Sequence, residues 1–137
     1  MAKEGRGFYD TNVLVAYLFR EEDRFGVAKE VLEKHVVKAL SIISLHETHM
    51  YSIRFGVEDR FIGVKESLHK LFRVEPLSQD VCVKASHLRK SYGVPEVDSL
   101  ILATAVFLEY NYFYTFDDDF RELNNKVIEK TMVRYLA

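Results

Sequence analysis

The sequence predicts an α/β fold, a three-layer sandwich in which helices flank a central, mainly parallel, twisted β-sheet. Short apolar runs alternate along the chain with longer segments of helical periodicity, the order that parallel strands with helical crossovers produce. The apolar runs at 39–44 and 112–116 also lack polar–apolar alternation, which is expected of strands covered on both faces. These two observations favour a doubly wound sheet.

Length and composition predict a single domain spanning residues 1–137. The chain has 137 residues, of which 48% are hydrophobic, and it shows no internal repeat or flexible linker. It lacks an apolar run of membrane-spanning length, and its first residues, MAKEGRG, lack the apolar core of a secretory signal. We therefore expect a cytoplasmic protein outside the membrane. Cys82 is the only cysteine, and its valine neighbours predict a packed thiol.

The first half of the chain predicts two strands and their following helices. In GFYD, Phe8 and Tyr9 precede Asp10, but the residues before them are too polar for a long central strand. We expect this strand to be short or to begin at a sheet end. Helical spacing of apolar residues follows, and the run ALSIIS at 39–44 is the next strand, with Glu47 at the start of the helix after it.

The second half predicts three helices and a last clear strand. Apolar residues recur at helical spacing between 61 and 72, and again from 81 to 88. The segment PEVDSLILATAVFLEY begins with Pro95, has Asp98 in its first turn and is then apolar on almost every side, so we expect a buried helix. The strand YFYTF at 112–116 runs directly into three aspartates, Asp117 to Asp119.

Four acids are expected to meet at one edge of this sheet. Asp10, Glu47 and Asp117 each follow a strand, and Asp98 lies at the start of a helix. Ligands of open parallel sheets bind outside the carboxyl ends of the strands. Carboxylates gathered there repel one another, and a hard divalent cation such as Mg²⁺ compensates them through oxygen ligands. The residue types therefore predict a metal site without Cys or His.

Two other interpretations of these acids are compatible with the sequence. Asp10 and Asp117 could simply cap the helices that they precede. The distribution of charge is also ambiguous. Residues 95–122 hold seven acids and one base, which gives this segment a net charge of −6. Because the whole chain carries −2, the rest of the chain carries +4. An acidic cation site within a basic body and a solvated acidic face would give the same numbers.

The same residues carry a resemblance to the PIN-domain nucleases. The matching segments are FYDTNVLVAYL, SIISLHET, VDSLILATAV and TFDDDF, in the order of that family and over essentially the whole chain. The resemblance implies that Asp10, Glu47, Asp98 and Asp117 form the acidic catalytic site. Asp119 matches an additional acid of the last motif and would either be an auxiliary metal ligand or support the ligands from behind, whereas Asp118 falls at a variable position.

The resemblance implies hydrolysis of RNA phosphodiester bonds by a Mg²⁺- or Mn²⁺-dependent endoribonuclease. Asp10, Asp98 and Asp117 would hold the metal, and Glu47 would orient the attacking water. Thr11, Asn12 and Thr115 flank the acids and could orient carboxylates or hydrogen-bond a phosphate. Equally, Thr115 could be only a strand residue and Asn12 only a helix cap.

Small single-domain proteins of this kind most resemble the toxins of toxin–antitoxin pairs, the VapC-like ribonucleases. The resemblance implies an RNA substrate, an antitoxin protein as partner and a homodimer. The aromatic residues Tyr51 and Phe55 and the tail TMVRYLA could serve such interfaces or belong to the core, whereas we expect Phe61 in the core. A housekeeping RNA-processing nuclease and a catalytically decayed binding module are the alternatives, and the decayed module predicts missing acids.

Two other enzyme classes fit the sequence less well. SLHETHM places His46 and His49 three residues apart, one short of the HExxH spacing of a zinc site, and no third strong ligand is evident. A phosphatase that uses Asp10 as nucleophile would resemble its family in a DxD pair, but Asn12 occupies the second position of that pair. The basic residues Arg20, Arg24, Arg54 and Arg121 are candidates for phosphate contact or solvated charges.

Overall fold

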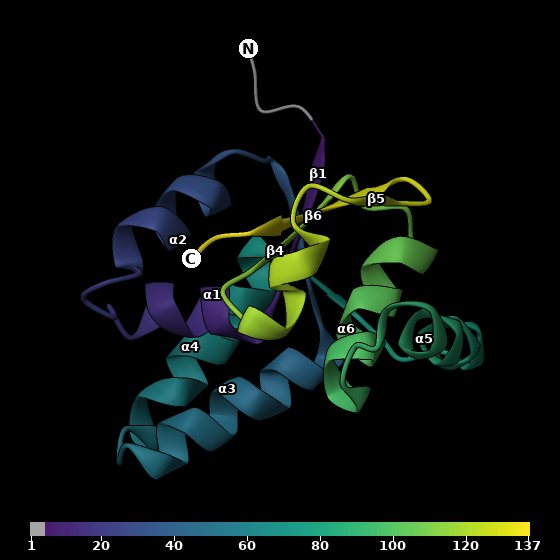
Figure 1. The fold of residues 1–137 in the computed structure, drawn as a ribbon. Coiled ribbons are helices and arrows are strands. Elements are labelled where there is room, and N and C mark those ends of the chain that lie inside the picture. The colour runs from purple at the N-terminus through teal and green to yellow at the C-terminus, as the bar shows by residue number, and fades with distance from the viewer. Residues whose placement is uncertain (1–4) are drawn as a thin grey trace.

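The computed structural model describes residues 5–137, in which six strands form one sheet between helices (Figure 1). The strands are β1 (Arg6–Tyr9), β2 (Val37–Ser41), β3 (Arg73–Glu75), β4 (Tyr112–Thr115), β5 (Val127–Ile128) and β6 (Thr131–Tyr135). The helices are α1 (Thr11–Leu18), α2 (Phe25–Glu33), α3 (Ile42–Arg54), α4 (Glu58–Leu71), α5 (Gln79–Tyr92), α6 (Glu96–Phe107) and the 3₁₀ helix η1 (Asp118–Leu123). The predicted α/β sandwich with a mainly parallel sheet is confirmed.

The strand order places β1 inside the sheet. The order is β3-β2-β1-β4-β6-β5, and every neighbouring pair is parallel except β5 and β6. From β1 the chain passes outward to β2 and β3 on one side and then returns to β4 on the other side. The order therefore reverses between β1 and β4, and the carboxyl ends of these two strands border the crevice where such sheets bind ligands.

Both faces of the sheet are covered, as the uninterrupted apolar runs predict. Phe8 and Phe113 belong to a buried cluster with the apolar residues of α5 and α6. Their neighbours Tyr9 and Tyr114 belong to a second cluster with residues of α1 and α2. Successive side chains of a strand point to opposite faces, so each strand supplies both layers of core. In Figure 1 the sheet accordingly lies between α1 and α2 on one side and α5 and α6 on the other.

The first strand is short, as expected, but it lies in the middle of the sheet. Arg6 begins it, and its guanidinium lies 4.1 Å from the centre of the Tyr110 ring. At Gly7 a Cβ atom would lie 2.6 Å from both the His35 ring and the Tyr9 hydroxyl, so only glycine fits this close approach. A favourable cation–π contact and a close packing requirement thus explain two residues that are unusual in a central strand.

One strand boundary differs from the prediction, and this changes the place of Glu47. The strand predicted for 39–44 ends at Ser41, and α3 begins at Ile42. The Ser41 hydroxyl accepts a hydrogen bond of 3.1 Å from the Ile43 N–H and caps the helix. Glu47 therefore lies in the second turn of α3 rather than at its start.

Two expectations about exposure are also decided by the structure. Cys82 is exposed, so the prediction of a packed thiol was wrong: on α5 only Val81 of the local apolar run faces the core. Phe61 is buried, as expected. The tail TMVRYLA supplies β6, which pairs with β4, so most of it belongs to the sheet.

The helix predicted to be buried is α6. All residues from Ile101 to Val106 are buried, and Phe107 is the first exposed residue after them. Its polar first turn places Asp98 at the edge of the sheet where β1 and β4 end. Among residues 5–137, none of the helices combines the length and apolar character needed to cross a bilayer.

Candidate active site

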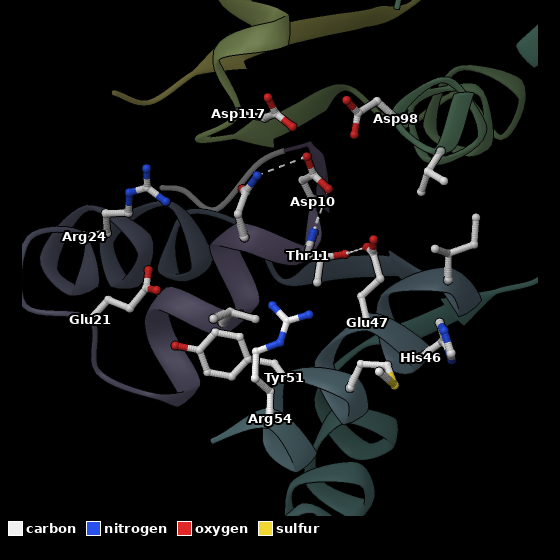
Figure 2. A pocket seen from close by; sticks show the side chains of 15 residues that line it. Asp10, Thr11, Glu21, Arg24, His46, Glu47, Tyr51, Arg54, Asp98 and Asp117 are labelled. Atoms are coloured by element: carbon white, nitrogen blue, oxygen red, sulfur yellow. Dashed lines mark hydrogen bonds between the residues drawn. The ribbon is translucent and has the colours of Figure 1, made fainter. Parts of the chain in front are cut away.

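A cavity of about 650 Å³ opens at the carboxyl edge of the sheet, and all four predicted acids line it. Asp10 and Asp117 come from the ends of β1 and β4, Asp98 from the first turn of α6 and Glu47 from α3. These residues are separated by up to 107 positions in the sequence and meet because the parallel strands end together. Figure 2 shows the carboxylates of Asp10, Asp98 and Asp117 directed toward one another.

Asp10 is the most firmly held of the acids. It is only 4% exposed, and it caps α1 by accepting a hydrogen bond of 2.8 Å from the Thr11 N–H. Its other carboxylate oxygen accepts hydrogen bonds from the Thr115 hydroxyl at 2.8 Å and the Asn12 amide at 3.3 Å. The capping interpretation therefore holds for Asp10, but the cap uses only one of its two oxygens.

The triplet that follows β4 divides into residues inside and outside the cavity. Asp117 lines the cavity and also caps η1, accepting a hydrogen bond of 2.9 Å from the Asp119 N–H. The N–H of Asp117 donates to the Thr115 hydroxyl at 3.0 Å, so this threonine connects Asp117 to Asp10. Asp118 is exposed and is bonded to Arg121 and Tyr135, away from the other acids.

Asp10, Asp98 and Asp117 form a cluster in which one ligand oxygen from each lies within 4.8 Å of the others. Asp119, predicted as an auxiliary ligand, is neither in this cluster nor among the residues that line the cavity, although its charge helps to raise the pKa of Asp98. Glu47 stands beside the cluster: its Oε1 accepts a hydrogen bond of 2.5 Å from the Thr11 hydroxyl, which also contacts Ser44 at 2.8 Å. Three of the predicted acids therefore lie close together, and the fourth, Glu47, is held beside them by a hydrogen bond from Thr11.

The electrostatics of the cluster are unfavourable for the protein alone. Burial raises the pKa of Asp10 to about 6, and the charges of Glu47 and Asp117 add to this, although hydrogen bonds from Thr115 and Thr11 oppose it. Burial also raises the pKa of Asp98 to about 8, with contributions from the charges of Asp10, Asp117 and Asp119. Both shifts mean that the ionised carboxylates are destabilised where they stand.

The donor set fits a hard divalent cation. All the converging ligand atoms are carboxylate oxygens, which Mg²⁺ and Mn²⁺ prefer, and sulfur or imidazole ligands are not part of the cluster in residues 5–137. The raised pKa values of Asp10 and Asp98 mean that no nearby positive charge of the described chain stabilises their ionised forms, and a bound cation would supply that charge. Chemistry and electrostatics therefore agree on this kind of ion.

The three predicted positioning residues all contact the acids or the strand that carries them. Thr11 donates to Glu47, and Thr115 donates to Asp10. Asn12 donates weakly to Asp10, and its amide oxygen accepts a hydrogen bond of 2.9 Å from the Phe116 N–H. These hydrogen bonds connect all three residues to the carboxylates of the site or to the segment that carries Asp117.

The two histidines of SLHETHM do not converge on a metal. His46 lines the cavity, but His49 is bonded to Glu58 at 2.8 Å and stacks on Phe61 with 4.5 Å between ring centres. No group of metal ligands that includes a histidine is found in the described part of the chain. The zinc interpretation therefore has no geometric support.

Several residues of the cavity were not predicted from the sequence as part of it. They are Val15, Glu21, Ile43, Met50, Tyr51 and Val97, together with His46, which was not placed in the site. Of the basic candidates, Arg24 and Arg54 line the cavity. Arg121 instead pairs with Asp118 at 3.0 Å, and the Arg20 guanidinium lies 5.1 Å from the centre of the Phe25 ring.

Comparison with known proteins defines the class to which this fold and site belong. The model of the PIN domain family matches residues 8–126, and this chain is a member of that family. The matched segment runs from β1 through η1 and includes all the acids of the cavity. The resemblance inferred from the sequence motifs is thereby confirmed.

Individual relatives are similar over nearly their whole length. Ribonuclease VapC2 of Methanocaldococcus jannaschii is 22% identical over 136 residues, which cover 89% of this chain and 91% of that protein. A chain of a solved toxin–antitoxin complex from Klebsiella pneumoniae is 26% identical, with a TM-score of 0.73 and coverage of 96% of this chain and 99% of that one. The solved structure of Mycobacterium tuberculosis VapC20, a sarcin–ricin loop cleaving toxin, has a TM-score of 0.72 at 23% identity, covering 90% and 97% of the two chains.

Proposed function

We propose that this protein is a divalent-metal-dependent endoribonuclease that hydrolyses phosphodiester bonds of RNA. The observation that carries the proposal is the cluster of Asp10, Asp98 and Asp117, whose ligand oxygens lie within 4.8 Å of one another at the strand-order reversal. Membership of the PIN family and similarity to proteins named as ribonucleases support the choice of reaction. The presence of all four acids argues against a decayed binding module.

The residues of the cavity would divide the chemical work. Asp10, Asp98 and Asp117 would hold Mg²⁺ or Mn²⁺, with Asp119 as an auxiliary ligand beside Asp98. A bound divalent cation supplies charge that stabilises the phosphate oxygens in the transition state and makes a nearby water easier to deprotonate. Glu47, held by Thr11, would orient the attacking water, and Thr115 and Asn12 would fix the Asp10 carboxylate.

We assign the protein to the toxin side of a toxin–antitoxin pair. Structures similar to this chain include a toxin–antitoxin complex and a toxin, which supports an antitoxin protein as partner. Exposed apolar side chains on and beside α3 and α4 also support a protein partner, either an antitoxin or a second copy of this chain. These side chains are Met50, Ile53, Phe55, Ile62 and Leu71. The toxin would act in the cytoplasm on cellular RNA. A gene for a small DNA-binding protein beside its own gene would separate this role from housekeeping RNA processing.

A cleavage assay on single-stranded and structured RNA tests the reaction. Wild type is compared with Asp98→Asn and Asp10→Asn in Mg²⁺, in Mn²⁺ and in chelator. We expect cleavage that requires metal and falls about a thousandfold or more in either variant, because each removes a charged ligand from the reacting centre.

Asp118→Asn is the matched control, since it removes the same charge from an exposed carboxylate outside the cavity. It should cleave like wild type. An active Asp10→Asn/Asp98→Asn double variant would refute the proposal. If wild type cleaves no RNA, a Mn²⁺ titration distinguishes a silent site, which binds metal, from a decayed one, which does not.

A further inference from the structure

Helix α3 presents one continuous face to the cavity. Its cavity-lining residues recur at intervals of three and four positions, the spacing of one helix face: Ile43, His46, Glu47, Met50, Tyr51 and Arg54. Glu47 stands near the acidic cluster, and Arg54 is the last residue of the helix. The face therefore runs from the acidic centre, past Met50 and Tyr51, to a single positive charge.

Arg54 is directed into the cavity but has no partner in the described chain. Arg54 is an exposed residue, and Figure 2 shows its guanidinium beside Tyr51, on the side of Thr11 and Glu47. Within residues 5–137 it makes neither an ion pair nor a side-chain hydrogen bond. Arg121 and Arg89, by contrast, pair with Asp118 at 3.0 Å and Glu96 at 3.8 Å. An unpaired guanidinium is a fork of donors suited to a phosphate group.

Arg54 lies at the end of this α3 face that is farther from the acidic cluster. Seven residues separate its backbone from that of Glu47, which corresponds to about 10 Å along an α-helix. An RNA strand whose scissile phosphate lies at the acidic cluster would carry a neighbouring phosphate toward this end of the face.

Tyr51 lines the cavity between Glu47 and Arg54. Its ring packs against Phe19 at 4.6 Å and against Phe55 at 4.5 Å between ring centres, so aromatic neighbours already occupy it. It is a firm side of the channel rather than a free platform for a base.

We infer that Arg54 is a positioning residue that binds a phosphate flanking the scissile one, in an RNA strand that lies along α3. This inference rests on the proposed ribonuclease function and adds to it a direction for the substrate. The contact is made alike in the ground state and the transition state, because the flanking phosphate does not change during the reaction. Loss of Arg54 should therefore raise KM and leave kcat nearly unchanged.

Binding provides the first test and does not depend on turnover. A fluorescein-labelled, unstructured oligoribonucleotide is titrated in Mg²⁺ against variants made in the Asp98→Asn background. Arg54→Ala should weaken binding about tenfold and reduce the slope of log K against log salt by about 1, the signature of one lost phosphate contact. Arg54→Lys should recover part of the affinity.

Arg60→Ala is the matched control, because Arg60 is exposed on α4, lies outside the cavity and carries the same charge. If it lowers affinity and salt slope as much as Arg54→Ala, a general charge effect explains both and the inference is wrong. Unchanged binding by Arg54→Ala also overturns it and would leave this face of α3 to a protein partner.

Substrate chemistry locates the contact. In the shortest RNA that wild type cleaves, each phosphate flanking the cleaved bond is replaced in turn by a neutral methylphosphonate. One replacement should raise KM about tenfold for wild type and have no further effect on Arg54→Ala, since both changes remove the same contact. Equal effects on the two proteins at every position would refute the inference. If wild type cleaves no RNA, the Mn²⁺ titration decides the ribonuclease proposal separately, and the binding test alone decides the role of Arg54.

Discussion

The strand side and the helix side of the acidic site hold their aspartates differently. On the strand side, Asp10 is 4% exposed and accepts hydrogen bonds from the Thr11 N–H, the Thr115 hydroxyl and the Asn12 amide. On the helix side, Asp98 is less buried, and in residues 5–137 no neutral group donates a hydrogen bond to it. Its neighbours are other acids, which raise its pKa further.

Burial alone would predict the higher pKa for Asp10, and the opposite is found. The pKa of Asp10 is raised to about 6 and that of Asp98 to about 8. Donated hydrogen bonds stabilise a carboxylate and offset part of the cost of its burial, whereas like charges increase that cost. The comparison indicates that hydrogen bonds offset part of the cost of the Asp10 charge, whereas the charge of Asp98 lacks this compensation.

The largest effect expected from this difference is on the pH dependence of stability. Both carboxyls have a folded pKa above the ordinary 3.8, so their contribution to stability is complete below about pH 4 and is lost as the pH rises. The two carboxyls interact and titrate as a pair, so the loss extends up to about pH 8, and removing the Asp98 carboxyl should remove its upper part. In chelator, Asp98→Asn should therefore melt several degrees higher than wild type above pH 8, at roughly 3–5 °C for each kcal/mol.

Thermal unfolding followed by circular dichroism from pH 4 to 9 measures this. Mg²⁺ should restore wild type at the alkaline end and have much less effect on Asp98→Asn, because a ligand that binds only the folded state stabilises it. Asp59→Asn, an exposed charge-matched control on α4, should follow the wild-type curve. Parallel curves for wild type and Asp98→Asn would show that the charge of Asp98 is not the destabilising one.

A second, smaller effect tests the hydrogen bonds of the strand side. The Thr115 hydroxyl donates to Asp10 and accepts from the N–H of Asp117, so Thr115→Val releases two of the three clustered acids. Outer contacts of this kind are worth about ten- to a hundredfold in metal affinity, and we expect such a loss in a Mn²⁺ titration calorimetry experiment.

Thr104→Val provides the matched control for this change. Thr104 is also buried, but its hydroxyl bonds to the Leu100 carbonyl within α6 at 2.8 Å and does not contact the acids. Its variant should bind Mn²⁺ like wild type. If Thr115→Val binds equally well, the strand-side hydrogen bonds are not what prepares Asp10 and Asp117.

The acids of the site could be predicted from the sequence because each has a local signature. Asp10 and Asp117 follow apolar strands, and Asp98 lies in the first turn of an apolar helix that begins after a proline. The parallel arrangement of the strands then places them at one edge. The layers of the fold were predictable for the same reason, since strands covered on both faces have long apolar runs.

The remainder of the cavity has no such signature. Tyr51 and Arg54 belong to it only because α3 turns one face toward α1, and their spacing is that of any amphipathic helix. The boundary at Ser41 depends on one hydroxyl that caps α3, which periodicity cannot detect. Cys82 was misassigned because two flanking valines suggested burial on a helix where only one residue in three or four faces the core.

The smallest effect is expected at the contact that joins the two sides. Glu47 lies on α3, but the Thr11 hydroxyl at the start of α1 donates a hydrogen bond of 2.5 Å to its carboxylate. Thr11→Val keeps the shape of the side chain and removes this hydrogen bond, so kcat should fall about tenfold or less while the Mn²⁺ affinity stays unchanged. Ser44→Ala removes the other partner of Thr11 and leaves its bond to Glu47, so it should cleave at nearly the wild-type rate. A fall in metal affinity in Thr11→Val would instead place Glu47 among the metal ligands, and the distinction between the clustered aspartates and Glu47 would then disappear.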